Sequence, residues 1–139
     1  GGNTNTRINV AASDTVYAIN NMLHNDGRID GLFALEQNLT IDATAEDGWG
    51  WFIFLGTNNQ TWSYSSTIRP TSGIRVDKTA GTVSQAAGTT DLNCSRFDLF
   101  NGEFIAPSNL FRISNYWGSS FVTIFNHTGG VFTHNNGTT

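Results

Sequence analysis

The chain has 139 residues, the size of a single domain. Only 13% of them are charged, the net charge is -4, and the one lysine is Lys78. Scattered arginines exclude the clustered positive charge that a nucleic-acid partner requires, and a single cysteine, Cys94, excludes an internal disulfide. No apolar run approaches the roughly 20 residues that cross a bilayer, so we expect no membrane partner. Asn, Thr, Ser and Gly must fill the surface, which suits packing against identical neighbours because few charges need desolvation there.

The first predicted elements are an N-terminal arm, residues 1–12, and a short helix, residues 13–24. Ser13 can cap this helix. Apolar residues then recur at helical spacing along about three turns. They are Val16, Ile19, Met22 and Leu23.

From Gly31 onward, short apolar segments separated by turn residues predict strands. We expect these at Leu32–Leu35, Leu39–Ala43, Trp49–Leu55, Thr61–Ser65, Ile68–Val76, Arg96–Phe100, Glu103–Ala106, Leu110–Ser114, Phe121–Asn126 and Gly130–Thr133. The segment Trp49–Leu55 is continuously apolar, which predicts burial on both faces or cover from a neighbouring subunit. Residues 78–91 are rich in Gly, Ala, Thr and Ser. They predict a long loop, a weak edge strand, or an arm that orders against a partner.

The arrangement of these strands is predicted to be antiparallel. Asn101-Gly102 favours a tight hairpin, because a type I′ turn needs positive φ at both central residues. Strands spaced by about 8 to 12 residues without intervening helices are typical of a sandwich or jelly roll. We therefore expect one mainly β domain over residues 1–139, an antiparallel jelly roll or β-sandwich with one short helix. The alternative is a parallel β-helix, whose rungs residues 109–115 and 121–126 resemble; the absence of a steady period of about 20 to 25 residues disfavours it.

Metal and calcium sites are not predicted. The three histidines, His24, His127 and His134, are far apart in sequence. Asp26 and Asp30 flank a Gly-containing turn but lack the full spacing of a calcium loop. We expect polar loop histidines, a plain turn, and no cofactor.

Catalytic groups are equally sparse. The carboxylate pairs available for glycoside hydrolysis are Glu46 with Asp47, and Asp98 with Glu103 across the predicted hairpin. All four lie beside turns, where solvated carboxylates are expected. Cys94 lacks an activating neighbour and is predicted to be a small buried apolar side chain. We expect that the protein is not an enzyme.

Aromatic residues are the strongest signal, with ten Phe, four Trp and three Tyr. Such side chains anchor cores and subunit interfaces, or stack on the faces of sugars. For Trp49 and Trp51 we favour the core or an interface. For Trp62, Tyr64 and Trp117, which polar residues flank, we favour a ligand or partner surface. The full candidate set is Trp49, Trp51, Phe52, Phe54, Trp62, Tyr64, Tyr116 and Trp117.

A short segment carries a family resemblance. Gly102-Glu103-Phe104-Ile105-Ala106-Pro107, followed by Leu110-Phe111-Arg112-Ile113, resembles a strand pair of the complement C1q and tumour-necrosis-factor-like jelly rolls. The resemblance implies a trimeric jelly roll of ten strands, a shape also used by phage fibre tips and capsid-decorating proteins.

The polar-neutral, aromatic-rich and cysteine-poor composition is similar to that of phage and viral structural proteins. We therefore expect a bacteriophage capsid decoration, or cement, protein. It would be a homotrimer on the virion surface, assembled in the host cytoplasm, with the major capsid protein or other virion subunits as partners. The alternative is an extracellular carbohydrate- or receptor-binding module, such as a fibre tip or lectin-like adhesin. A third reading, a secreted glycoprotein, rests on Asn-x-Ser/Thr sequons at Asn38, Asn59, Asn93, Asn126 and Asn136.

Overall fold

The computed structural model describes residues 7–11, 13–46, 48–65, 73–89, 91–114 and 124–138, which form strands and no helix. The strands are β1 (Arg7–Asn9), β2 (Thr15–Ala18), β3 (Met22–Leu35), β4 (Leu39–Ala45), β5 (Gly50–Phe54), β6 (Gln60–Tyr64), β7 (Gly73–Gln85), β8 (Asp91–Cys94), β9 (Arg96–Ile105), β10 (Leu110–Ile113), β11 (Phe125–His127) and β12 (Val131–Thr133). No helix in these ranges is long and apolar enough to cross a membrane.

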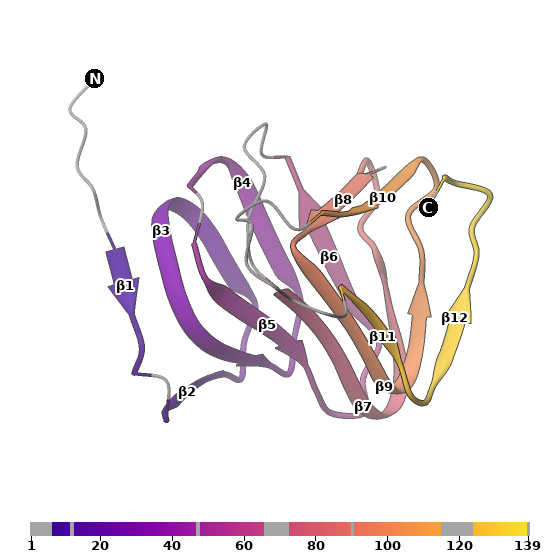
Figure 1. Ribbon diagram of the computed structural model, residues 1–139, viewed down its shortest axis with the longest axis horizontal. Helices are drawn as coiled ribbons and strands as arrows, with labels where there is room; N and C mark the ends of the chain where they lie inside the picture. The colour runs from indigo at the N-terminus through magenta and orange to yellow at the C-terminus, as the bar shows by residue number, and fades with distance from the viewer. Residues whose placement is uncertain are drawn as a thin grey trace.

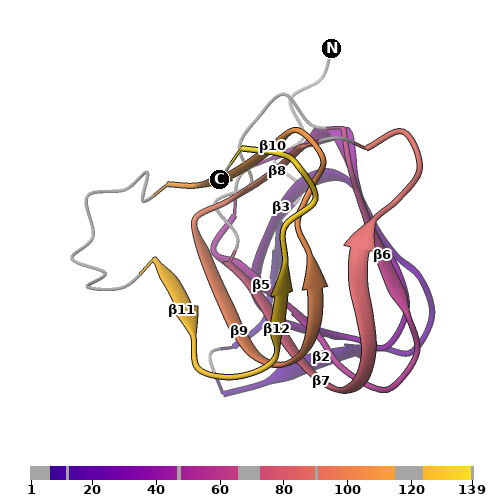
Figure 2. The same cartoon turned by 90° about the vertical axis from the view of Figure 1, so that its right-hand side faces the viewer.

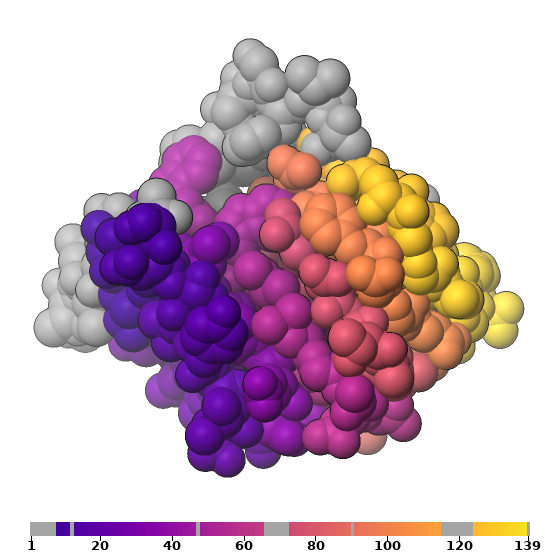
Figure 3. Space-filling model, turned by 90° about the horizontal axis from the view of Figure 1, so that it is seen from below, coloured from indigo at the N-terminus to yellow at the C-terminus, as the bar shows by residue number. Residues whose placement is uncertain are grey.

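These strands pair in parallel and wind into a β-solenoid of about five turns. The turns follow one another along the long axis from the N-terminus to the C-terminus (Figure 1), and Figure 2 shows the strands surrounding one interior. The surface accordingly shows bands in sequence order, from indigo to yellow (Figure 3). The long strands β3, β7 and β9 bend, so each contributes to more than one sheet.

The prediction of an antiparallel jelly roll or β-sandwich is wrong. Alternation of apolar and polar residues reports one buried face and is the same for parallel and antiparallel neighbours. The solenoid also lacks a fixed period. Bonded neighbours on successive turns are 17 residues apart at Asn21 and Asn38, 23 apart at Asn38 and Thr61, and 30 apart at Glu103 and Thr133. Variable corners therefore conceal the repeat.

The predicted helix over residues 13–24 is also wrong, because β2 and the start of β3 occupy this range. Val16 pairs in register with Phe33, and Met22 pairs with Leu39 on the next sheet. A bend between the two strands gives these apolar residues a spacing that imitates a helical stripe.

The hairpin predicted at Asn101-Gly102 is a corner inside the continuous strand β9. Gly102 has φ +83°, whereas the φ of Asn101 is not positive. A type I′ turn needs positive φ at both residues, so it does not form. Both halves of β9 pair in parallel with β7, before and after the bend. Residues 78–91, predicted as a loop or edge strand, include the second half of β7, and Val83 is fully buried there.

The interior consists of apolar side chains stacked in register from turn to turn. One row on the first sheet contains Phe33, Phe52, Ile74 and Phe97, each at most 3% exposed. A second row contains Leu35, Phe54, Val76 and Leu99, all 0% exposed. Because full burial of one such side chain contributes about 1.5 to 3 kcal/mol, these rows supply the main stabilisation of the fold.

Candidate functional site

The structure places several of the predicted aromatic residues in the interior. Phe52 and Phe54 are 0% exposed and Trp62 is 1% exposed. Tyr64 is half-buried and packs against the same core. Phe52, Phe54 and Trp62 therefore stabilise the solenoid and offer no surface for stacking on a sugar.

Trp49 and Trp51, which the sequence assigned to the core or an interface, lie outside the core. The interface stays a prediction. In β5 the side chain of Phe52 points inward, so that of Trp51 points outward. Trp49, just before the strand, is 46% exposed. Tyr116 and Trp117 lie outside the described residues.

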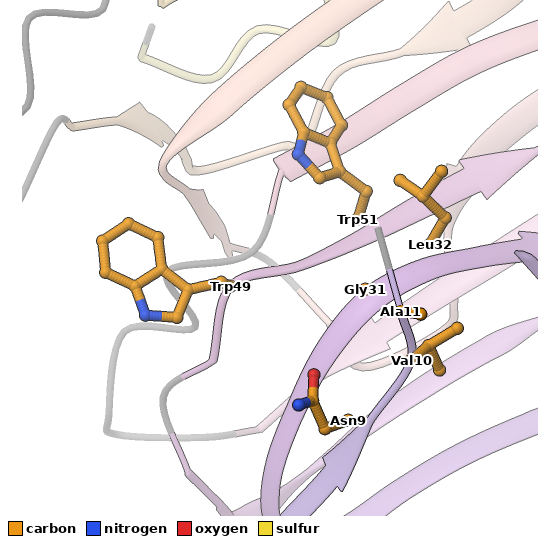
Figure 4. A pocket seen from close by; sticks show the side chains of 7 residues that line it. All are labelled: Asn9, Val10, Ala11, Gly31, Leu32, Trp49 and Trp51. Carbon is orange, nitrogen blue, oxygen red and sulfur yellow. The ribbon is translucent and has the colours of Figure 1, made fainter. Parts of the chain in front are cut away.

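The two outward indoles border a hollow of about 430 Å³. Its lining residues are Asn9, Val10, Ala11, Gly31, Leu32, Trp49 and Trp51. Figure 4 shows the indoles on two sides of the hollow, Gly31 below Trp51, and Asn9 at the edge opposite Trp51. The lining is therefore mainly apolar and aromatic, with one amide side chain.

Backbone constraints hold this hollow in shape. Gly31 has φ +111°, and a Cβ added to it would lie 2.5 Å from Cβ of Val10, so only glycine lets the segment after β1 pass so closely. The backbone N–H of Val10 donates to the carbonyl oxygen of Asp30 at 2.9 Å. On the opposite wall, the backbone N–H of Trp49 donates to Oδ1 of Asp30 at 2.7 Å. Asp30 thus connects both walls.

Beside the hollow, Trp51 contacts a pair of arginines. Its indole lies over Gly73 on the next turn, where an added Cβ would come within 2.6 Å of the ring. The guanidinium carbons of Arg75 and Arg96 lie 5.2 Å and 5.3 Å from the ring centroid, which is cation–π distance. Arg75 also lies 4.8 Å from the Phe100 ring.

A buried carboxylate joins these arginines. Asp98 is 0% exposed and accepts from Nη2 of Arg75 at 3.1 Å through Oδ2, and from Nε of Arg96 at 3.0 Å through Oδ1. Two cations around one anion satisfy the desolvated carboxylate, as its burial requires. This cluster was not predicted from the sequence. Its signal was the alternation in Arg96-Phe97-Asp98, which sends both polar side chains outward.

The three histidines share one structural role. Nε2 of His24, His127 and His134 donates to the carbonyl oxygen of the glycine three residues later, at 2.9, 3.3 and 2.7 Å respectively. Each histidine therefore closes a turn of the form His-x-x-Gly. Within the described ranges, no three His, Cys, Asp or Glu residues are grouped to hold a metal ion.

The carboxylates considered for calcium binding and for acid–base chemistry are engaged elsewhere. Asp26, from the calcium-like segment, accepts from the N–H of Gly27 at 2.8 Å. Glu103, from a proposed acid pair, accepts from Oγ1 of Thr133 at 2.7 Å. Asp98 and Glu103 pair with different stretches of β7, on either side of its bend, so no hairpin brings them together. Asp47, the predicted neighbour of Glu46, lies outside the described residues.

Cys94 is buried, as predicted, and burial raises the pKa of its thiol. A raised thiol pKa leaves little thiolate at neutral pH, which disfavours a nucleophilic role. The side chain instead packs in the hydrophobic core.

Comparison with known proteins gives no match. No family model, no curated protein and no solved structure is similar to this chain. The geometry of the hollow and its neighbouring charges are therefore the guide to function.

Proposed function

We propose that this chain is a saccharide-binding module whose site is the hollow between Trp49 and Trp51. The observation that carries the proposal is the pair of outward indoles on two sides of one hollow, with the Asn9 amide at its edge. Sugar rings combine apolar C–H faces with hydroxyl groups. Aromatic rings can cover the former, and an amide can hydrogen-bond the latter.

The dimensions and rigidity of the hollow support this proposal. Its volume of about 430 Å³ falls within the usual range for small-molecule sites. Trp51 is held by Gly73 and two arginines, and the backbone of Trp49 is held by Asp30. Groups fixed before binding lose little conformational entropy when a ligand arrives.

This proposal keeps the carbohydrate-binding reading of the sequence but moves the site away from Trp62. The roles as a capsid decoration protein, a homotrimer and a non-enzyme stay predictions from composition and sequence motifs. A fibre-tip or adhesin role is compatible with a saccharide site, since such proteins bind surface glycans.

A glycan array tests the proposal with the wild type, Trp49→Ala and Tyr17→Ala. Tyr17 is 66% exposed in β2 and lies outside the hollow, so it is a matched aromatic control. We expect the wild type and Tyr17→Ala to bind the same glycans, and Trp49→Ala to lose about tenfold or more in affinity. Absence of glycan binding by the wild type, or equal binding by Trp49→Ala, would overturn the proposal.

A further inference from the structure

Arg96 continues the row of outward side chains that begins in the hollow. Leu32, Trp51, Gly73 and Arg96 are successive partners in register on β3, β5, β7 and β9. Leu32 and Trp51 line the hollow, and the indole of Trp51 covers Gly73. Arg96 therefore follows Trp51 two turns further along. The backbones of the two strands are about 10 Å apart at the usual strand spacing, and the Arg96 side chain reaches back to the Trp51 ring.

Donors remain available on this pair after Asp98 has been satisfied. Arg96 uses Nε for Asp98, and Arg75 uses Nε and Nη2. Among the described residues, neither Nη atom of Arg96 has a hydrogen-bond partner, and the same is true of Nη1 of Arg75. The side chains of Arg75 and Arg96 are 33% and 29% exposed, so solvent and ligands can reach them.

The local charge favours an anion. Two guanidinium groups face one carboxylate, which leaves one net positive charge beside Trp51. Asp98 fixes both guanidiniums, and the indole covers part of each, so their orientation is set before binding. Guanidinium N–H groups held in this way match the planar geometry of a carboxylate.

We propose that the ligand is an acidic oligosaccharide. One sugar ring occupies the hollow against Trp51, and the carboxylate of a uronic acid further along the chain binds the free Nη groups of Arg96, with Arg75 beside it. This inference rests on the saccharide-binding function proposed above and specifies its substrate class. Trp51 stands between the hollow and Arg96 in the row of paired strands, so the ligand is an oligosaccharide that extends past the indole.

The test uses an array that presents uronic-acid oligosaccharides, each beside its methyl ester. The methyl ester keeps the sugar rings and removes the negative charge. We expect the wild type to bind the acid about tenfold more tightly than the ester, since a charge-assisted hydrogen bond is lost with the charge. This preference should fall as salt rises from about 20 to about 300 mM, because the arginines are partly exposed.

Two substitutions locate the preference. Arg96→Gln removes one guanidinium and leaves Arg75 with Asp98 and Trp51, so we expect it to lose the preference for the acid and to bind acid and ester with equal affinity. Retained ester binding reports that the hollow is folded. Arg112→Gln is the control, since Arg112 is an exposed arginine of β10 and changes the net charge equally.

The outcomes separate the two proposals. Equal binding of acid and ester by the wild type would overturn the acidic ligand and leave the saccharide site standing, and so would an acid preference that survives in Arg96→Gln. Failure of the wild type to bind any member of the array would overturn the saccharide function itself. If Arg96→Gln does not fold, the salt dependence of the wild-type preference decides: a preference unaffected by salt contradicts the arginine site.

Discussion

Lys78, the only lysine of the chain, is 1% exposed and lies inside a bend of the solenoid. Its Nζ donates to the carbonyl oxygen of Leu55 at 3.0 Å and to Oε1 of Gln60. The amide nitrogen of Gln60 donates in turn to the carbonyls of Leu35 and Gln37 at 2.9 and 2.8 Å. This short buried network joins the corners of consecutive turns.

Replacing Lys78 by methionine keeps the apolar stem and removes the ammonium. The substitution leaves the carbonyl of Leu55 and the amide oxygen of Gln60 buried without this donor. We expect a loss of about 2 kcal/mol in the free energy of unfolding, measured by urea denaturation. Thr79→Ala, at an exposed neighbouring position, is the control and should cost much less. A Lys78→Met variant with the same free energy of unfolding as the wild type would show that this network does not stabilise the fold.

The same lysine makes stability depend on pH. Desolvation lowers the pKa of Lys78 below its ordinary value of 10.5. Between the lowered pKa and 10.5 the unfolded chain binds more protons than the folded protein, so the stability of the wild type rises with pH there. We expect the free energy of unfolding of the wild type, relative to that of Lys78→Met, to increase as the pH of the denaturation experiment rises toward 10.5. A difference that shrinks with rising pH would contradict the burial of this amine.

At the scale of elements, single left-handed glycines build corners between strands. Gly102 and Gly88 share φ +83°, but a Cβ on Gly102 would lie 2.7 Å from Cβ of Lys78, whereas nothing lies within 4 Å of one on Gly88. We expect Gly88→Ala to cost about 1 to 2 kcal/mol from backbone strain alone. Gly102→Ala should cost about 2 kcal/mol more, because the neighbouring backbone must also move.

Thermal or urea unfolding of the two alanine variants checks this prediction. The pair isolates the steric contribution, since the backbone strain is the same at both positions. Equal destabilisation by Gly102→Ala and Gly88→Ala would show that the tight contact with Lys78 does not constrain the corner.

The strands themselves could be predicted from sequence, but their arrangement could not. Segments such as Leu39–Ala43 and Leu110–Ser114 match β4 and β10 closely, because alternation identifies one buried face. Nothing local distinguishes a corner at Gly102 from a hairpin, since both need a left-handed glycine.

The amide side chains that join successive turns were also not recognised from the sequence. Asn38 and Asn59 accept backbone N–H groups of Thr61 and Thr82, at 2.8 and 3.0 Å, from positions that sequence reasoning assigned to loops or sequons.

The candidate site was foreseen only in part. The aromatic density indicated stacking surfaces, but the sequence favoured Trp62 because polar residues flank it, and that indole points into the core. Trp49 and Trp51 were assigned to the core or an interface because they lie in the continuously apolar segment Trp49–Leu55. Recognition of the hollow required the register that brings Val10 and Gly31 beside β5. Recognition of the two arginines around Asp98 required the register between β7 and β9.

At the scale of the whole molecule, the first turn exposes large apolar side chains. Val16, Tyr17, Ile19 and Leu23 are between 41% and 67% exposed. Such a cluster supports the predicted association with further copies of this chain, since monomers rarely expose large apolar patches. We expect mass photometry at micromolar concentration to show a homotrimer, and the double variant Ile19→Lys/Leu23→Lys to shift it toward monomer.

The control for this prediction is Val131→Lys, at an exposed apolar position in β12, which should leave the oligomer intact. A wild type that is monomeric at micromolar concentration would contradict the trimer. It would leave the saccharide site untouched, because every residue argued to form that site belongs to one chain.

The central claim is that a saccharide lies between Trp49 and Trp51, and nuclear magnetic resonance of the indole N–H groups tests it most directly. Each of the four tryptophans contributes one indole N–H signal, and single substitutions such as Trp49→Phe assign them. On titration with the best oligosaccharide from the array, we expect the signals of Trp49 and Trp51 to shift together, while that of Trp62, 1% exposed in the core, stays in place. Saturable binding that leaves both the Trp49 and the Trp51 signal unmoved would contradict the claim.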